Sequence, residues 1–181
     1  YYFTGVKIEK IPQWSIEMPF QGKIILIDPG HGGKDKGNSN QGVQEKDVNL
    51  KISLCLEKML RTAGAEVILT RTDDRYLSLG ERLEINHKWN PHFMISIHGN
   101  DNAYIKETIS EIYVYHGDQE AYQLATCILK ELKAIGIDSR EIIEADLYLT
   151  RESKNSTLIV EIGHSYLEKK DDMTKIARGI Y

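Results

Sequence analysis

Short apolar runs alternate with stretches of helical periodicity along most of this chain, and this alternation constrains the fold more than any other feature. The first run, residues 24–27, is continuously apolar and is closed by Asp28-Pro29-Gly30, as is typical of a buried parallel strand. Similar runs follow, and amphipathic helical segments separate most of them. The sequence therefore predicts an α/β domain of three layers (α/β/α) around a twisted, mostly parallel sheet of about six strands. The pattern also allows one antiparallel edge strand.

The predicted elements cover most of the chain after a different opening segment. Residues 1–21 contain Pro12, Trp14 and Pro19 without a clean period, so we expect an extended lead-in there and one domain over residues 22–181. A chain of 181 residues fits a single domain. Strands are expected at residues 23–27, 66–70, 92–97, 111–115, 147–150 and 158–162, and helices at about 46–63, 78–90, 121–135 and 173–180.

Charge and hydropathy exclude two classes of partner. A formal net charge of −4 and a pI near 5.9 argue against a basic surface that captures nucleic acid. No apolar run approaches the roughly 18 residues that cross a bilayer.

The chain starts at Tyr1, so we expect that a leader, either a signal peptide or a membrane anchor, precedes it in the full protein. We expect a monomer in which Cys55 and Cys127 are buried helical thiols, with a disulfide between them as the alternative.

Four residues that bind metals or move protons stand at the predicted carboxyl ends of strands, where α/β proteins form their sites. They are His31, Glu45, His98 and Glu161. Two imidazoles and one carboxylate suit zinc, which lowers the pKa of a bound water to near 7. Glu161 lies in an apolar run, where a carboxylate needs a facing charge and can act as a proton carrier. The spacing of these residues does not by itself distinguish a zinc site from an accidental cluster, because the chain has six histidines and no HExxH motif.

Five short motifs, taken in order, resemble the signatures of the zinc-dependent N-acetylmuramoyl-L-alanine amidases of the amidase type 3 family. The resemblance extends over residues 23–181, nearly the whole predicted domain. The motifs are Ile-Asp-Pro-Gly-His-Gly-Gly (27–33), Glu-Lys-Asp-Val-Asn-Leu (45–50), Thr-Arg-Thr-Asp-Asp (70–74), Ser-Ile-His (96–98) and Val-Glu-Ile-Gly (160–163).

This resemblance implies that His31, Glu45 and His98 bind Zn²⁺ and that Glu161 is the catalytic carboxylate. It implies a hydrolase that cleaves the amide between N-acetylmuramic acid and the L-alanine of the stem peptide in peptidoglycan. Members of the family serve as autolysins, cell-separation enzymes, phage lysins and spore-cortex enzymes. The lead-in is similar to that of the germination members, which predicts a secreted or membrane-anchored protein that faces the cell wall or spore cortex.

Three further residues are candidate substrate contacts. Arg151 follows a predicted strand and is expected to bind a stem-peptide carboxylate, unless it is a surface charge. Asn100 and His164 lie just beyond His98 and Glu161, where the chain departs from the family pattern. His164 is expected either to contact the substrate or to be a solvated loop residue.

Several alternatives stay open at this point. Asp28 either orients a ligand histidine or forms the turn before Pro29. At the level of function, the chain is alternatively a catalytically silent peptidoglycan-binding relative, or a zinc peptidase that acts on another amide.

Overall fold

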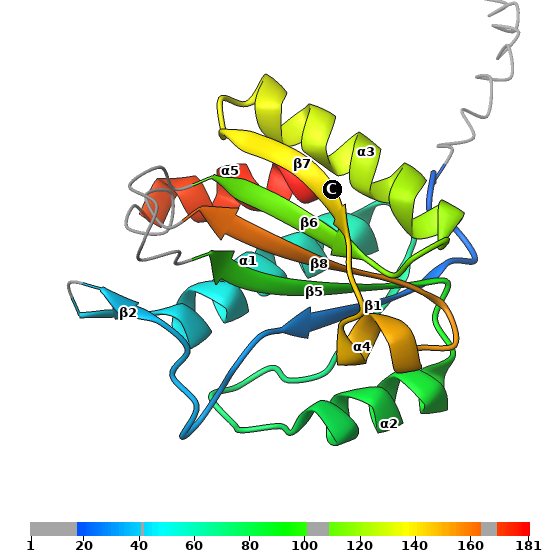
Figure 1. The fold of residues 1–181 in the computed structure, drawn as a ribbon, viewed down its shortest axis with the longest axis horizontal. Coiled ribbons are helices and arrows are strands. Elements are labelled where there is room, and N and C mark those ends of the chain that lie inside the picture. Colours follow the sequence, from blue (N-terminus) through cyan, green and yellow to red (C-terminus); the bar gives the residue numbers. More distant parts are fainter. Residues whose placement is uncertain (1–17, 41, 101–108, 164–169) are drawn as a thin grey trace, which may run out of the picture.

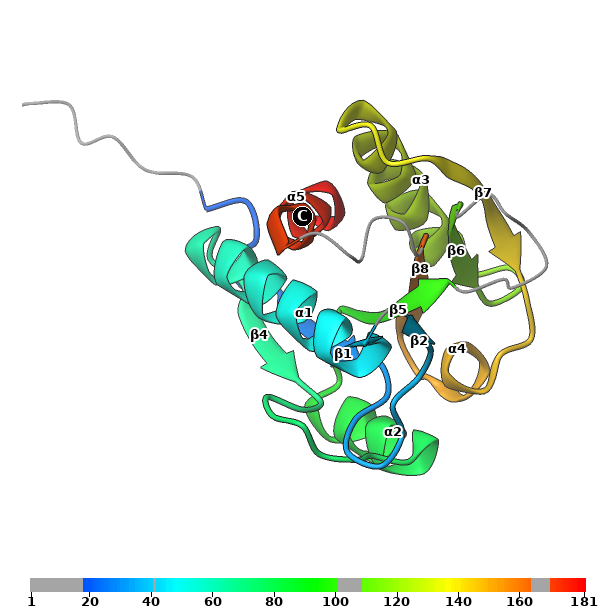
Figure 2. The same ribbon diagram turned by 90° about the vertical axis from the view of Figure 1, so that its left-hand side faces the viewer.

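The central sheet has six strands in the order β4-β1-β5-β8-β6-β7 and lies between two layers of helices (Figures 1 and 2). The computed structural model describes residues 18–40, 42–100, 109–163 and 170–181. The predicted three-layer α/β fold with a sheet of about six strands is confirmed. The strands are β4 (Glu66–Leu69), β1 (Ile24–Pro29), β5 (Phe93–Asn100), β8 (Ser156–Gly163), β6 (Ser110–Val114) and β7 (Ser139–Glu144).

Two strands at one edge of the sheet run against the other four. Strands β4, β1, β5 and β8 are mutually parallel, whereas β6 pairs antiparallel with β8 and β7 pairs parallel with β6. The sheet is therefore mostly parallel, and the one reversed edge strand that the sequence allowed is corrected to two reversed strands, β6 and β7. Residues 101–109 separate β5 from β6, which is shorter than the helical crossover that a parallel return needs. Helix α3 then supplies a crossover between β6 and β7 and keeps that pair parallel.

Helices cover the two faces of the sheet unequally (Figure 2). Three helices pack on one face over a large apolar core, which includes Ile27, Ile52 and Val160. The opposite face has a small core of Leu26, Leu83, Met94 and Leu149. The large layer contains α1 (Glu45–Thr62), α3 (Gln119–Ala134) and α5 (Lys170–Ile180), and the small layer contains α2 (Leu79–Trp89) and α4 (Tyr148–Glu152). A short hairpin of β2 (Ser39–Asn40) and β3 (Val43–Gln44) precedes α1.

Two sequence predictions of secondary structure were wrong. Residues 147–150 were expected as a strand, but Tyr148–Glu152 is helix α4, which places Leu149 in the small core. The remaining strand of the sheet is β7, which was not predicted. Its sequence, Ser-Arg-Glu-Ile-Ile-Glu, has exposed Arg140 and Glu141, as suits a charged edge strand, and its apolar signal is correspondingly weak.

The cysteines and the lead-in also differ from simple expectation. Cys127 is exposed and Cys55 is only half-buried, so the expected burial of both thiols is wrong; both lie beside the apolar stripes of their helices. Of the lead-in, residues 1–17 lie outside the described residues. Phe20 packs edge-on against Tyr181 at 5.9 Å between ring centroids, so the end of the lead-in contacts the domain. None of the helices in the described ranges combines the length and apolar character that crossing a bilayer needs.

Candidate functional site

The structure brings four predicted site residues together at the carboxyl ends of β1, β5 and β8. His31 follows β1, Glu45 opens α1, and His98 and Glu161 are register partners on the neighbouring strands β5 and β8. These four side chains line one open cavity of about 470 Å³. Residues separated by up to 130 positions along the chain therefore share one site, because parallel strands end at the same edge of the sheet.

Three of these side chains converge on a single point. Nε2 of His31 lies 3.0 Å from Oε1 of Glu45, and Nδ1 of His98 lies 3.2 Å from the same oxygen. All three ligand atoms lie within 4.8 Å of one another. Four-coordinate zinc with bonds of 2.0–2.2 Å places its ligand atoms about 3.4 Å apart, so this spacing fits the ion. The donor set, two imidazoles and one carboxylate, is also one that zinc prefers.

Glu45 is ionised at the centre of this group. Burial alone would raise the pKa of its carboxyl group, but contacts with His31 and His98 and hydrogen bonds from the backbone N–H groups of Gly99 and Asn38 hold that pKa far below its usual range. Burial opposes protonation of His31, yet its hydrogen bonds with Glu45 and Asp35 raise the pKa of the imidazole to about 9. An anionic carboxylate that holds a proton between itself and an imidazole is a place where a cation can replace that proton.

The loop that carries His31 adopts a conformation that depends on glycine. His31 itself has φ +59°, an uncommon backbone for a residue with a side chain. A Cβ atom on Gly30 would lie 2.3 Å from the ring of His98, and one on Gly37 would lie 2.5 Å from Oε2 of Glu45. These glycines allow the backbone to approach the ligand side chains closely. Asp35, which the sequence analysis missed, accepts a hydrogen bond from Nδ1 of His31 at 2.8 Å and orients the ring.

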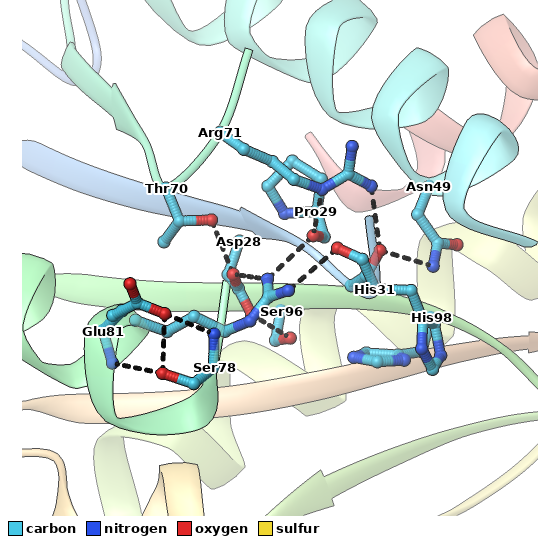
Figure 3. Close-up of polar contacts among 12 residues, drawn as sticks. Asp28, Pro29, His31, Asn49, Thr70, Arg71, Ser78, Glu81, Ser96 and His98 are labelled. Carbon is cyan, nitrogen blue, oxygen red and sulfur yellow. Dashed lines mark hydrogen bonds and ion pairs between the residues drawn. The ribbon is translucent and has the colours of Figure 1, made fainter. Parts of the chain in front are cut away.

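A network of buried polar side chains holds the backbone of the same loop in place (Figure 3). Asp28 is fully buried and accepts hydrogen bonds from the hydroxyls of Thr70 and Ser96, at 2.6 and 2.7 Å. It also pairs with the guanidinium of Arg82, which donates to the carbonyl oxygen of His31 at 2.8 Å. Although burial opposes ionisation, Arg82 and these hydrogen bonds hold the pKa of Asp28 below its usual value. Asp28 therefore acts on the loop through Arg82, and neither alternative left by the sequence describes it.

Arg71 is a second buried guanidinium in this network. It donates to the carbonyl oxygens of Pro29 and Gly30 at 2.9 Å each (Figure 3). It also donates to the carbonyl oxygen of Lys46 at 2.8 Å. The roles of Arg71 and Arg82 were missed from the sequence, because a buried arginine carries no local pattern that distinguishes it from a surface one. Together they tie the residues before His31 to the first turn of α1, where Glu45 begins the helix.

Glu161 occupies an environment that favours its protonated form. Burial raises the pKa of this carboxyl group, and the charges of Glu45 and Glu111 raise it further, against the opposing effect of His98 and His31. Tyr113 lines the same cavity and donates a hydrogen bond to Glu111 at 3.0 Å. Burial and Glu111 raise the pKa of the Tyr113 phenol to about 12, so it stays protonated at neutral pH.

Of the three predicted substrate contacts, only Arg151 has a side chain that the structure describes, and it does not line the site cavity. Arg151 lies on α4 away from the site cavity, and it pairs with Asp146 at 2.6 Å and Glu152 at 2.8 Å. Asn100 ends β5, where its backbone pairs with Gly163, and its side chain is not described. His164 lies outside the described residues. The metal-ligand prediction is therefore the part of the site that the geometry supports best.

Comparison with known proteins points to one family. A family model described as N-acetylmuramoyl-L-alanine amidase matches residues 25–181. A sporulation-specific N-acetylmuramoyl-L-alanine amidase of Bacillus subtilis is 33% identical over 84% of this chain and 59% of its own length. A probable cell wall amidase LytH of Staphylococcus aureus is 34% identical over 87% of this chain and 53% of its own length. The chain thus spans somewhat more than half the length of these two relatives.

Solved structures agree with the family match. The CwlD amidase from Clostridioides difficile, solved in complex with the GerS lipoprotein, superimposes with a TM-score of 0.82 and 31% identity. That match covers 88% of this chain and 94% of the other. The catalytic domain of CwlV, an N-acetylmuramoyl-L-alanine amidase from Bacillus (Paenibacillus) polymyxa, has a TM-score of 0.80 and 28% identity, with 87% and 93% covered.

Proposed function

This chain belongs to the N-acetylmuramoyl-L-alanine amidase family, and on that premise we propose that it is a zinc-dependent peptidoglycan hydrolase. Its substrate bond is the amide between the lactyl group of N-acetylmuramic acid and the L-alanine of the stem peptide. The observation that carries the proposal is the convergence of His31, Glu45 and His98 beside Glu161 in one open cavity.

We assign His31, Glu45 and His98 as the zinc ligands. Their donor atoms lie at the spacing that zinc requires, and Glu45 is ionised. Bound zinc supplies Lewis-acid polarisation of an amide carbonyl and a lowered pKa for water. Asp35 and the backbone N–H of Gly99 hold His31 and Glu45 in place, at 2.8 and 2.9 Å, so that little reorganisation is needed when the substrate binds.

Glu161 is the group that we assign to proton transfer. As the C–N bond of the amide breaks and the carbonyl carbon gains an oxygen from water, its carboxylate takes a proton from that water and delivers it to the nitrogen of L-alanine. Burial raises the pKa of this carboxyl group, which suits the delivery step, because a carboxyl group with a raised pKa takes up a proton from water more readily than an ordinary one.

The site of action that we propose is outside the cytoplasm, at the cell wall or the spore cortex. The similar proteins include a sporulation-specific amidase and a probable cell wall amidase, and both names support this location. The cavity at the carboxyl end of the sheet is open to solvent, so a polymeric substrate can reach the site.

The test is digestion of purified vegetative and spore-cortex peptidoglycan, with and without a chelator, followed by mass analysis of the soluble products. An amidase releases intact stem peptides from glycan, and the chelator abolishes the release. Cleavage within the stem peptides would identify a zinc peptidase instead. Binding to the wall without any release would identify a silent binding relative.

A Glu161→Gln variant separates metal binding from turnover. We expect it to retain one zinc per chain while turnover falls by roughly 10²–10⁴, because the proton carrier is lost. The exposed Glu152→Gln on α4 is the matched control and keeps its activity. If the Glu161→Gln variant released stem peptides as fast as the unmodified protein, Glu161 could not have the proposed role.

A further inference from the structure

Two cavities meet at the His31–His98 pair, and only one of them has been used so far. The larger cavity of about 470 Å³ contains Glu161. The smaller one, of about 140 Å³, lies between these imidazoles and the start of α2, and Glu161 does not line it. Besides the imidazoles, it is lined by four apolar side chains, by the paired charges of Asp28 and Arg82, and by Asp35 and Ser78. The apolar wall residues are Tyr76, Leu77, Leu79 and Leu149.

The position of Glu161 sets the direction in which an amide must lie across the site. Proton delivery requires that the leaving nitrogen face Glu161, which is the register partner of His98 on β8. Neighbouring strands are about 4.8 Å apart, so Glu161 flanks His98 on one side. Strand β1, with Asp28 beneath the smaller cavity, flanks β5 on the other side. A nitrogen over β8 therefore places the carbonyl carbon and its substituent toward β1 and α2.

We infer that the smaller cavity is an acyl-side subsite that binds the D-lactyl ether of the muramic acid residue, with the sugar ring held at its mouth by Tyr76 and Leu79. This inference rests on the proposed function. The stem peptide then occupies the larger cavity, beside Glu161 and Leu147.

The size and polarity of the smaller cavity match a lactyl group. At about 30 Å³ for each water-sized group, 140 Å³ holds roughly five heavy atoms. Three of the five heavy atoms of the lactyl group, namely the branching carbon, its methyl group and the ether oxygen, lie inside, and the carbonyl carbon and oxygen lie where the two cavities meet. A pyranose ring is too large to enter as well, so it must stay at the mouth. Leu77 and Leu149 provide apolar contacts for the methyl group.

Two large apolar side chains are exposed to solvent at the mouth of this cavity. Tyr76 is 43% exposed and Leu79 is 50% exposed, although both are large hydrophobic residues. Nζ of Lys34 lies 4.4 Å from the ring centroid of Tyr76, which covers part of that ring. Exposed apolar side chains at the rim of a cavity are typical of a ligand-contact surface. The apolar face of a sugar ring is the part of the proposed substrate that such a rim would contact.

The experiment uses zinc-loaded protein and three synthetic muramyl dipeptides. One is the natural compound, one has a glycolyl ether without the lactyl methyl, and one has glycine in place of L-alanine. We expect the lactyl compound to exceed the glycolyl one in kcat/KM by about tenfold, as removal of one buried methyl allows. Leu77→Ala, which removes one of the methyl contacts, should reduce this ratio to about twofold and leave the alanine-to-glycine ratio unchanged.

Leu147→Ala is the matched control, because Leu147 is a leucine of the larger cavity. It should change the alanine-to-glycine ratio and leave the lactyl-to-glycolyl ratio unchanged. Leu77 is only half-buried and lies in the loop before α2, so its variant is expected to fold. The opposite assignment of ratios to variants, or no change in either ratio, would overturn the inference.

A binding measurement tests the subsite even if no substrate is cleaved. N-acetylmuramic acid, which retains the lactyl group, should shift the NMR methyl signals of Leu77, Leu79 and Leu149 but not those of Leu147. N-acetylglucosamine, which keeps the sugar ring but lacks the lactyl group, should leave the signals of Leu77 and Leu149 unshifted. Selective shifts without turnover would keep the subsite and reject the proposed function. Shifts centred on Leu147, or no shifts at all, would reject the subsite.

Discussion

Replacing Asp28 with asparagine should destabilise this fold strongly, although the change is nearly isosteric. Asp28 is fully buried and is the carboxylate that compensates the buried guanidinium of Arg82. Asparagine keeps a hydrogen-bond acceptor for Thr70 or Ser96, but it leaves the charge of Arg82 without its partner. The effect of the substitution is therefore mainly the effect of breaking a buried ion pair.

The expected magnitude follows from that loss. Removing one partner of a buried pair lowers the free energy of unfolding by about 3–5 kcal/mol. Domains of ordinary size have about 5–15 kcal/mol in total, so the variant loses a large share of its stability. For a chain of this length, each kcal/mol corresponds to about 2–4 °C in Tm, which predicts a fall of roughly 6–20 °C. Zinc affinity should fall too, because Arg82 also holds the carbonyl oxygen of His31.

Urea unfolding of the metal-free protein at pH 7 measures the effect without a contribution from zinc. Asp47→Asn, at an exposed position in the first turn of α1, is the control and should change stability much less. A loss below about 1 kcal/mol for Asp28→Asn would refute the argument, since it would mean that the pair is not what balances the buried charge.

The pH dependence has a defined sign. The folded-state pKa of Asp28 lies below its unfolded value, which is about 3.9. Its contribution is therefore fully present above pH 4 and is lost as the pH falls through the folded-state pKa. The difference in stability between the unmodified protein and Asp28→Asn should be constant near neutral pH and should shrink below about pH 4. A difference that grows on acidification would contradict the assignment.

Three further predictions concern the metal site and the thiols. Gly30→Ala should abolish tight zinc binding, because its Cβ would lie 2.3 Å from the ring of His98; one zinc per chain after dialysis would contradict this. Zinc at a thousand times its Kd should stabilise the fold by about 4 kcal/mol, measured as a rise in Tm, and His98→Ala should remove that response. Cys55 and Cys127 should both react with a thiol reagent in the folded, unreduced protein, and a reductant should leave the Tm unchanged.

Much of the fold could be predicted because its signals are local. The apolar run before Asp28 and the helical spacing of Val48, Ile52 and Leu56 each depend on residues that are close in the sequence. The failures also have local causes. Strand β7 is charged at the sheet edge and resembles a loop, whereas residues 147–150 have the composition of a strand but begin helix α4. Secondary structure at these two places depends on neighbours that the sequence does not identify.

The site, like the fold, has a part that could be predicted from the sequence and a part that could not. Its metal-ligand candidates were predictable, because strand ends can be located from the sequence and His31, Glu45, His98 and Glu161 stand near them. The side chains that support the site were not predictable. Asp28 and Arg82 are 54 positions apart and Tyr113 reaches the site from a reversed strand.

The sequence by itself determined most of the strands and helices, though not β7 or α4, and which chemical groups stand at the strand ends. Only the tertiary structure decided that two edge strands are reversed, that buried arginines hold the His31 loop, and that two cavities of different size flank the imidazoles. The physical reason is the separation along the chain of the residues that decide each feature. Periodicity is set by each residue and its near neighbours, whereas burial of a charge and the shape of a cavity depend on contacts between segments that only the folded sheet brings together.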